Sequence, residues 1–224
     1  MLIVIEGLDG AGKSTQVGMI REYIISKGYN LKYLHFPRYE APIYGELIAK
    51  FLKGDFGNID QVHPQLVALI YALDRMDASS QIKSWLDDGN IVLLDRYVYS
   101  NIAYQCSKIE DETLSKKLRD WIFNLEYNVY KIPLPDVNIF LDVPIDFVES
   151  RLSTSRENDS DRDYLEGKRD IHEENLDFQI GVRNIYLREC SLDKNFVKID
   201  CSSDEGQMLP ADLIFEKIKE KLSL

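Results

Sequence analysis

The stretch LIVIEGLDGAGKST, residues 2–15, decides the fold of this chain. An apolar run leads directly into residues 7–14, which match the phosphate-loop pattern G-x-x-x-x-G-K-[ST] at every fixed position. Glycines in such a loop let backbone N–H groups surround phosphate oxygens, and the N-terminus of the next helix adds free donors and a favourable dipole. The stretch therefore predicts a strand, a loop that binds a nucleoside triphosphate, and a helix.

Two side chains of this loop carry most of its expected chemistry. Lys13 supplies a positive charge to the β- and γ-phosphates, and the Ser14 hydroxyl is a ligand for Mg²⁺. A glycine-rich turn that binds nothing is the alternative, and the strand before the loop and the helix after it argue against that interpretation. The residues expected to bind the triphosphate are Gly7, Leu8, Asp9, Gly10, Ala11, Gly12, Lys13, Ser14 and Thr15.

Outward from this loop, short apolar runs alternate with helical patterns. Besides residues 2–5, runs with strand character cover 31–35, 91–94, 137–141 and 196–199. They are continuous, as in strands that are buried on both faces of a parallel sheet. Helical patterns cover 13–27, 64–86 and 210–222.

This alternation predicts an α/β fold of the P-loop NTPase type. We expect a five-stranded parallel sheet with helices on both faces. No repeat, low-complexity tract or linker divides the chain, so residues 1–224 are expected to form one domain.

The composition is that of an ordinary globular protein, with 45% hydrophobic and 29% charged residues. No apolar run approaches the roughly 20 residues that span a bilayer, and the N-terminus lacks a signal-peptide pattern, so we expect neither membrane insertion nor secretion. A net charge of −11 disfavours nucleic acid as a partner. Cys106, Cys190 and Cys201 have neither disulfide nor zinc spacing, which favours buried or partly buried thiols in a reducing cytoplasm.

Two segments lie where predicted strands end, at the carboxyl edge of the sheet. Asp95 can hold Mg²⁺ or its water shell there, and Arg96 can bridge phosphates and stabilise the charge of the transferring group. In the segment FPR at 36–38, Arg38 is suited to a forked contact with phosphate. An ordinary salt-bridged strand end is the alternative for the first segment, and the second is a weak signal by itself.

Two more segments carry groups that suit a flat ligand. Tyr71 and Arg75 are four residues apart on a predicted helix, so the ring and the guanidinium share one face. In SNIAYQ, residues 100–105, Tyr104 can form a wall and Gln105 can offer an amide to a base. The alternative for each is ordinary packing, with the tyrosine half-buried in the core and the arginine in solvent.

Taken together, the motifs resemble those of the thymidylate kinases, a family in the P-loop nucleoside monophosphate kinase group. They are EGLDGAGKST at 6–15, FPR at 36–38, YALDR at 71–75 and DRYVYSNIAYQ at 95–105, followed by an arginine-containing segment at 151–169 and DIHE at 170–173. They follow the family's order along the whole chain, and the DRYxxSxxAYQ stretch is the most specific. The resemblance implies ATP- and Mg²⁺-dependent phosphorylation of dTMP to dTDP by a cytoplasmic homodimer.

The same resemblance implies roles around the acceptor phosphate and sugar. Asp9 would meet the 3′-hydroxyl of the monophosphate, and Arg38 and Arg96 would hold its phosphate. Asp95 would help to place Mg²⁺. Tyr104 would lie under the deoxyribose and crowd a 2′-hydroxyl, which favours deoxynucleotides.

The implied base site lies further along the cleft. Tyr71 would stack on thymine, Arg75 would bond its exocyclic oxygen, and Gln105 would reach the ring edge. Relatives often have Phe at the position of Tyr71, and a stacking surface survives that change. The full set implied for substrate binding is Asp9, Phe36, Arg38, Tyr71, Arg75, Arg96, Ser100, Tyr104 and Gln105.

One departure from the family concerns the catalytic arginine. Some members carry an arginine inside the phosphate loop, where this chain has Gly10. The class without it takes this arginine from the lid, here 151–169, a hydrophilic segment whose alternative is a solvated loop. Our hypothesis is that Arg156 or Arg162 closes over the γ-phosphate and excludes water, with Arg151 as a third candidate. The implied catalytic set is therefore Lys13, Asp95 and Arg96 together with Arg156 and Arg162.

Two other functions are weighed against this one. A deoxynucleoside kinase or another monophosphate kinase shares the phosphate loop, but a nucleoside acceptor would need a carboxylate base near its 5′-hydroxyl. Arg38 and Arg96 argue instead for an acceptor that already carries a phosphate. A nucleotide-dependent switch without turnover is the third hypothesis, and it would leave Tyr71, Arg75 and Gln105 without a purpose.

Overall fold

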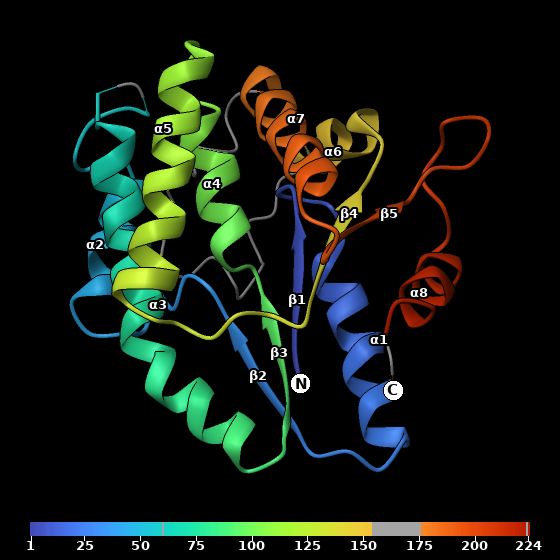
Figure 1. The fold of residues 1–224 in the computed structure, drawn as a ribbon. Helices are drawn as coiled ribbons and strands as arrows, with labels where there is room; N and C mark the ends of the chain where they lie inside the picture. The colour runs from blue at the N-terminus through green and yellow to red at the C-terminus, as the bar shows by residue number, and fades with distance from the viewer. Residues whose placement is uncertain (60, 154–175, 223) are drawn as a thin grey trace.

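Five parallel strands form the sheet at the centre of the fold, in the order β2-β3-β1-β4-β5 (Figure 1). This computed structural model describes residues 1–59, 61–153, 176–222 and 224. All five predicted strands are confirmed, and four of them extend one or two residues further because polar residues at their carboxyl ends still pair in the ladder. The strands are β1 (Leu2–Gly7), β2 (Leu31–His35), β3 (Ile91–Asp95), β4 (Val137–Asp142) and β5 (Phe196–Asp200).

Two groups of helices cover the sheet, so the prediction of helices on both faces is confirmed. On one face α1 (Lys13–Ser26) packs beside α8 (Ala211–Lys219), and on the other α3 (Pro64–Asp87), α4 (Val98–Cys106) and α7 (Leu176–Leu192) lie side by side (Figure 1). This arrangement follows from right-handed crossovers between parallel strands. The remaining segments are α2 (Tyr44–Leu52), α5 (Glu112–Phe123), the π-helical turn η1 (Asn124–Val129) and α6 (Ile145–Ser153).

The three central strands explain why the apolar runs are continuous. Every residue of β1, β3 and β4 is buried between the two layers of helices. Ile5 pairs with Asp95 and Gly7 pairs with Leu141, which brings the carboxyl ends of these strands to one edge of the sheet. The phosphate loop and the turn after β3 therefore lie next to each other at that edge.

Two prolines mark the beginnings of helices, and one of them lies one position earlier than the sequence predicts. Pro64 occupies the first turn of α3, as its fixed φ allows. The helical pattern at 210–222 predicts Pro210 as a residue of the first turn, whereas it is the N-cap residue before α8, with φ −54° and ψ 146°. No described helix is both long and apolar enough to cross a membrane. Cys106 and Cys201 are buried and Cys190 is partly buried, all three as free thiols.

Candidate active site

The phosphate loop joins β1 to α1 through two left-handed residues. Gly10 and Gly12 both have φ +76°, a conformation that costs little only for glycine. Helix α1 begins at Lys13, whose Nζ donates to the carbonyl oxygen of Leu8 at 2.9 Å. Burial lowers the pKa of Lys13 to about 8, and the positive charge of Arg96 acts in the same direction.

Beside this loop, Asp95 ends β3 with one carboxylate oxygen unused. Its Oδ2 lies 3.3 Å from Nδ1 of His35, whereas its buried Oδ1 accepts no hydrogen bond from the described residues. Burial acts to raise the pKa of Asp95, but His35 and Lys13 outweigh it and the pKa is lowered. An ionised carboxylate and the hydroxyl of the exposed Ser14 are a donor set that fits Mg²⁺, which takes few protein oxygens and keeps waters and phosphates.

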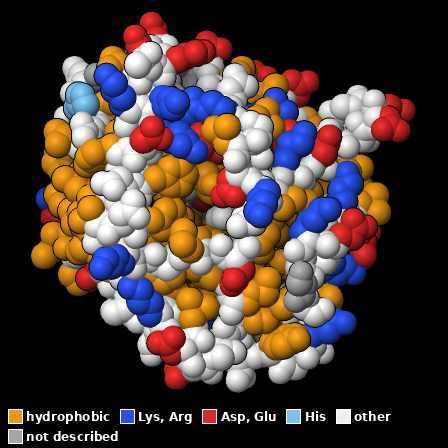
Figure 2. All heavy atoms as spheres, in the orientation of Figure 1, with side chains coloured by type: hydrophobic (Ala, Val, Ile, Leu, Met, Phe, Trp, Pro, Cys, Tyr) orange, Lys and Arg blue, Asp and Glu red, His pale blue; other side chains and the backbone are white. Residues whose placement is uncertain are grey.

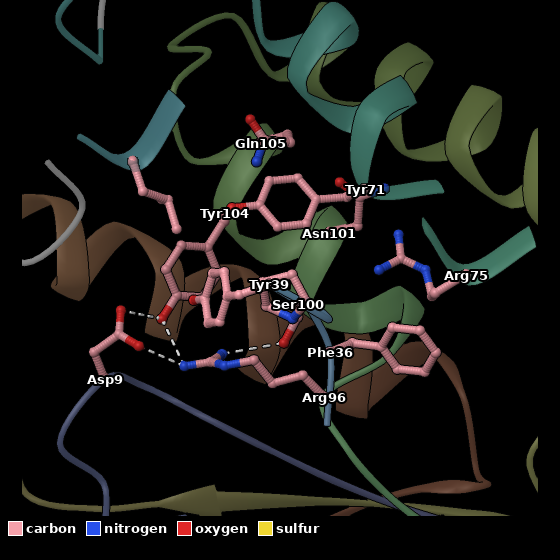
Figure 3. Close-up of a pocket in the computed structure, with 12 residues that line it drawn as sticks. Asp9, Phe36, Tyr39, Tyr71, Arg75, Arg96, Ser100, Asn101, Tyr104 and Gln105 are labelled. Carbon is pink, nitrogen blue, oxygen red and sulfur yellow. Dashed lines mark hydrogen bonds and ion pairs between the residues drawn. The ribbon is translucent and has the colours of Figure 1, made fainter. Parts of the chain in front are cut away.

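A pocket opens next to the loop, and it collects most of the predicted substrate residues (Figure 3). Eight of the nine line it, and Arg38 is the exception. The lining comes from the phosphate loop, the turns after β2 and β3, and helices α2, α3 and α4. It consists of Asp9, Phe36, Pro37, Tyr39, Leu52, Tyr71, Arg75, Arg96, Ser100, Asn101, Tyr104 and Gln105.

The surface view shows how this negatively charged chain still presents cations. On the face drawn in Figure 2, hydrophobic side chains surround a hollow near the middle, and Lys and Arg side chains stand interspersed with Asp and Glu. The net charge of −11 is therefore compatible with local groups of basic residues.

Arg96 lies at one end of the pocket, between the phosphate loop and α4. Its Nη1 donates to the carbonyl oxygen of Gly7 at 2.9 Å and to Oγ of Ser100 at 3.1 Å. Its Nη2 donates to Oδ1 of Asp9 at 2.5 Å and to the Tyr104 hydroxyl at 3.2 Å, and Tyr104 in turn donates to Oδ2 of Asp9. Arg96 also has φ +67°, so the turn after β3 aims it at this end (Figure 3).

Glu6, which the sequence analysis missed, fixes that turn from the neighbouring strand. This fully buried carboxylate accepts hydrogen bonds from the backbone N–H groups of Tyr97 and Ser100, at 2.9 and 3.2 Å. It also accepts from the hydroxyls of Ser100 and Tyr186. Since the first helical N–H groups have no partner within the helix, Glu6 caps the N-terminus of α4. Burial raises the pKa of Glu6.

Arg75 lies at the other end of the pocket and is held by a second residue that the sequence analysis missed. Its Nε and Nη2 donate to the two oxygens of Glu126, at 2.5 and 2.7 Å. Asn101, also missed, donates through Nδ2 to Glu126 and to the carbonyl oxygen of Ala68, both at 3.0 Å. The DRYVYSNIAYQ stretch contains Asn101, so its place one turn before Gln105 was the available signal.

Gln105 and Tyr71 complete this end of the pocket. Oε1 of Gln105 accepts from Nζ of Lys108 at 3.0 Å, which leaves the amide N–H₂ group for other contacts. Tyr71 lies near Asn101 and Tyr104, as Figure 3 shows. Aromatic rings, amide groups and Arg75 thus lie at one end of the pocket, and Arg96 and Asp9 lie at the other.

Four predicted arginines are not among the described residues that line the pocket. Arg38 does not line the pocket, because its Nε and Nη2 are held by Asp74 at 2.8 and 2.9 Å and by Asp77 at 2.6 Å. Arg156 and Arg162 lie outside the described residues. Arg151 is in the last turn of α6, with its guanidinium carbon 5.3 Å from the ring centre of Phe147.

Comparisons with known proteins agree on one family. The family model for thymidylate kinase matches residues 5–209. A thymidylate kinase of Mycobacterium tuberculosis is 31% identical over 186 residues, which cover 83% of this chain and 84% of that protein. A probable thymidylate kinase of Methanosphaera stadtmanae is 30% identical over 99% of this chain and 97% of its own length. The solved structure of a thymidylate kinase from Candida albicans aligns with a TM-score of 0.70 and 26% identity, covering 98% of this chain and 89% of that one.

Proposed function

Because this chain belongs to the thymidylate kinase family and phosphorylates dTMP to dTDP with ATP, we propose that the γ-phosphoryl group passes to dTMP by in-line transfer, with Arg96 between the donor and acceptor phosphates. The observation that carries this proposal is the position of Arg96. One guanidinium contacts both the phosphate loop, at Gly7, and the pocket wall, at Asp9 and Tyr104. A cation at that junction can neutralise charge on the donor and on the acceptor phosphate together.

The donor site is the phosphate loop, residues Gly7–Thr15. ATP bound there places its β- and γ-phosphates against the N-terminus of α1 and the Lys13 ammonium. In the structure that ammonium is bonded to loop carbonyl oxygens, so the phosphates replace neutral acceptors with charged ones. Ser14 and Asp95 are the residues that would hold Mg²⁺, which would neutralise part of the charge of the phosphates.

The acceptor site lies at the Arg96 end of the pocket. Arg96 holds the dTMP phosphate, and Asp9, now paired with Arg96, is close enough to meet the sugar 3′-hydroxyl. Arg38 supports the same phosphate through Nη1, since the ion pairs with Asp74 and Asp77 use its other nitrogens. The acceptor oxygen is already an anion, so the transfer needs no general base.

The base site lies at the Arg75 end, and its free groups match thymine. Thymine presents a carbonyl oxygen next to a ring N–H. Arg75 keeps Nη1 outside its ion pair as a donor to that oxygen, and the unused Oδ1 of Asn101 is the acceptor for the N–H. Tyr71 stacks on the ring, and the Gln105 amide reaches its edge. The Tyr104 ring packs under the sugar and crowds a 2′-hydroxyl.

The lid and the assembly are carried over from the family resemblance alone. We propose that Arg156 or Arg162 closes over the γ-phosphate, that residues 1–224 act as one domain, and that the enzyme is a cytoplasmic homodimer. Single replacement of each arginine by lysine identifies the catalytic one, since only that change reduces kcat strongly. Light scattering of the purified chain checks the dimer.

A coupled assay of ADP release tests the reaction, with ATP and Mg²⁺ and with dTMP, dUMP, UMP and thymidine offered separately. We expect the highest kcat/KM with dTMP and a much lower value with UMP. Turnover of thymidine but not of dTMP would refute the proposal and remove Arg38 and Arg96 from acceptor binding. Equal turnover of dTMP and UMP would refute the role of Tyr104.

A further inference from the structure

The fully buried carboxylate of Glu126 lies behind the base site without lining the pocket. It is carried by η1, a π-helical turn that directly follows α5. Such turns are rare and often occur at functional sites. Glu126 has no exposed surface, and its partner Arg75 is only 2% exposed. A buried charge pair of this kind is weak evidence for stability, which raises the question of what else it does.

The contacts of Glu126 fix two pocket residues at once. Its Oε2 accepts from Nε of Arg75 at 2.5 Å, and its Oε1 accepts from Nη2 of Arg75 at 2.7 Å and from Nδ2 of Asn101 at 3.0 Å. Burial alone would lower the pKa of Arg75, but the charge of Glu126 outweighs burial and raises it. Because a guanidinium can only donate, the pair with Glu126 fixes the position of a donor in the pocket that Arg75 lines.

The orientation of the Asn101 amide is also determined. Its Nδ2 faces two groups that can only accept, the Glu126 carboxylate and the carbonyl oxygen of Ala68. Turning the amide over would place its oxygen against both of them. The oxygen Oδ1 is consequently at the other end of the amide. It is buried and accepts no hydrogen bond from the part of the chain that the structure describes.

We propose that Glu126 is a positioning residue that sets the hydrogen-bond polarity of the base site. By holding Arg75 as a donor and Asn101 as an acceptor, it selects a pyrimidine with a carbonyl next to a ring N–H, as in thymine or uracil. Cytosine presents the reverse pattern, an amino group next to an unprotonated ring nitrogen, and would face both residues with mismatched groups. This inference rests on the proposed placement of the base between Arg75 and Asn101.

Glu126→Gln tests the inference because glutamine keeps the shape and removes the charge. One of its two end groups is a donor, so Arg75 loses one acceptor in either orientation of the glutamine amide. Where the amide nitrogen takes the position of Oε1, Asn101 loses its acceptor as well and its amide is free to turn. A site built for specific hydrogen bonds rejects a mismatched analogue by about 10⁴-fold, so the unmodified chain should prefer dTMP over dCMP strongly. In Glu126→Gln we expect the ratio of kcat/KM for dTMP to that for dCMP to fall at least about tenfold, mainly through a higher KM for dTMP.

Glu189→Gln is the matched control. Glu189 is also a buried glutamate, 1% exposed, and it accepts from Nε of Arg119 at 2.8 Å, but it lies on α7 outside the pocket lining. Its variant should melt at a lower temperature and keep the dTMP to dCMP ratio. A ratio that falls equally in both variants would overturn the proposal, because general loosening would then explain it.

Further outcomes separate a failure of this inference from a failure to fold and from a failure of the proposed reaction. A folded Glu126→Gln with an unchanged ratio of dTMP to dCMP would overturn the proposal. If that variant does not fold, Glu126→Asp replaces it. We expect an intermediate ratio in Glu126→Asp, and an unchanged ratio would contradict the proposal. Calorimetric binding of dTMP and dCMP to the unmodified chain runs in parallel. Equal affinities would overturn the inference, whereas selective dTMP binding without turnover would refute only the proposed reaction.

Discussion

The two ends of the pocket each contain an arginine paired with a carboxylate, but the two pairs differ in burial and in geometry. Arg96 and Asp9 are 11% and 22% exposed, and Arg96 divides its donors among four acceptors. Arg75 and Glu126 are 2% and 0% exposed, and they form one two-pronged pair. The first arginine can exchange partners when a phosphate arrives, whereas the second is fixed before any ligand binds. The comparison suggests that charge neutralisation needs an exchangeable cation and that base selection needs a fixed one.

Removing one carboxylate from each pair tests the difference in stability, and this is the largest effect that we expect. Glu126→Ala leaves Arg75 buried without a partner and should reduce the free energy of unfolding by about 3–5 kcal/mol. For a chain of this size that corresponds to a melting temperature lower by roughly 6–20 °C. Asp9→Ala should change the free energy of unfolding by about 1 kcal/mol or less, because Asp9 is partly exposed and Arg96 keeps three other hydrogen-bond acceptors. Denaturant unfolding of both variants checks this, and equal losses would contradict the contrast.

Arg96→Lys tests whether the exchangeable arginine stabilises the transferring phosphoryl group. Lysine keeps the charge but loses the forked geometry that contacts the loop and the pocket together. We expect kcat to fall by about 10²–10³-fold with an unfolding curve close to that of the parent. Steady-state kinetics with saturating ATP and dTMP measure this. A loss below tenfold would place the transition-state charge on other groups and weaken the comparison.

A pH profile sharpens the comparison at the donor side. The pKa of Lys13 is lowered from 10.5 to about 8, so the free enzyme loses this cation as the pH rises past about 8. We expect kcat/KM for ATP to fall by up to about tenfold per pH unit above that value. The same shift adds to stability as the pH rises from about 8 to 10.5, because the unfolded chain binds the proton and the folded chain does not. Lys13→Arg is the control, and its profile should be flat over this range from a lower starting value.

Tyr104→Phe gives the smallest expected change. The hydroxyl bonds to Asp9 at 2.7 Å and to Arg96 at 3.2 Å, and its loss should reduce kcat/KM for dTMP by about 2–10-fold. Since the ring remains, the preference for dTMP over UMP should be unchanged. Competition between the two nucleotides in one assay measures it. A preference that falls with the hydroxyl alone would assign the discrimination to hydrogen bonding and not to crowding.

The sequence was sufficient to predict the sheet and the phosphate loop, because buried parallel strands are continuous apolar runs and the loop has a fixed pattern. It was insufficient for the contacts behind the pocket. Glu126 is 51 residues from Arg75, and the π-helical turn that carries it has no recognised pattern. Glu6 sits inside the motif, yet its partners Tyr97 and Ser100 are more than 90 residues away. Pro210 was misplaced by one position because a proline fits both an N-cap and a first turn.

The cap that Glu6 provides has a consequence for the spacing between the donor and acceptor sites. Glu6 directly precedes the phosphate loop and also anchors the first turn of α4, from which Ser100, Asn101, Tyr104 and Gln105 line the pocket that we propose for the other nucleotide. A single side chain on the central strand of the sheet thus positions the donor site and the acceptor site relative to each other. The span between the two phosphates is accordingly built into the rigid scaffold, and loop movements can add water exclusion and further cations without having to define that span.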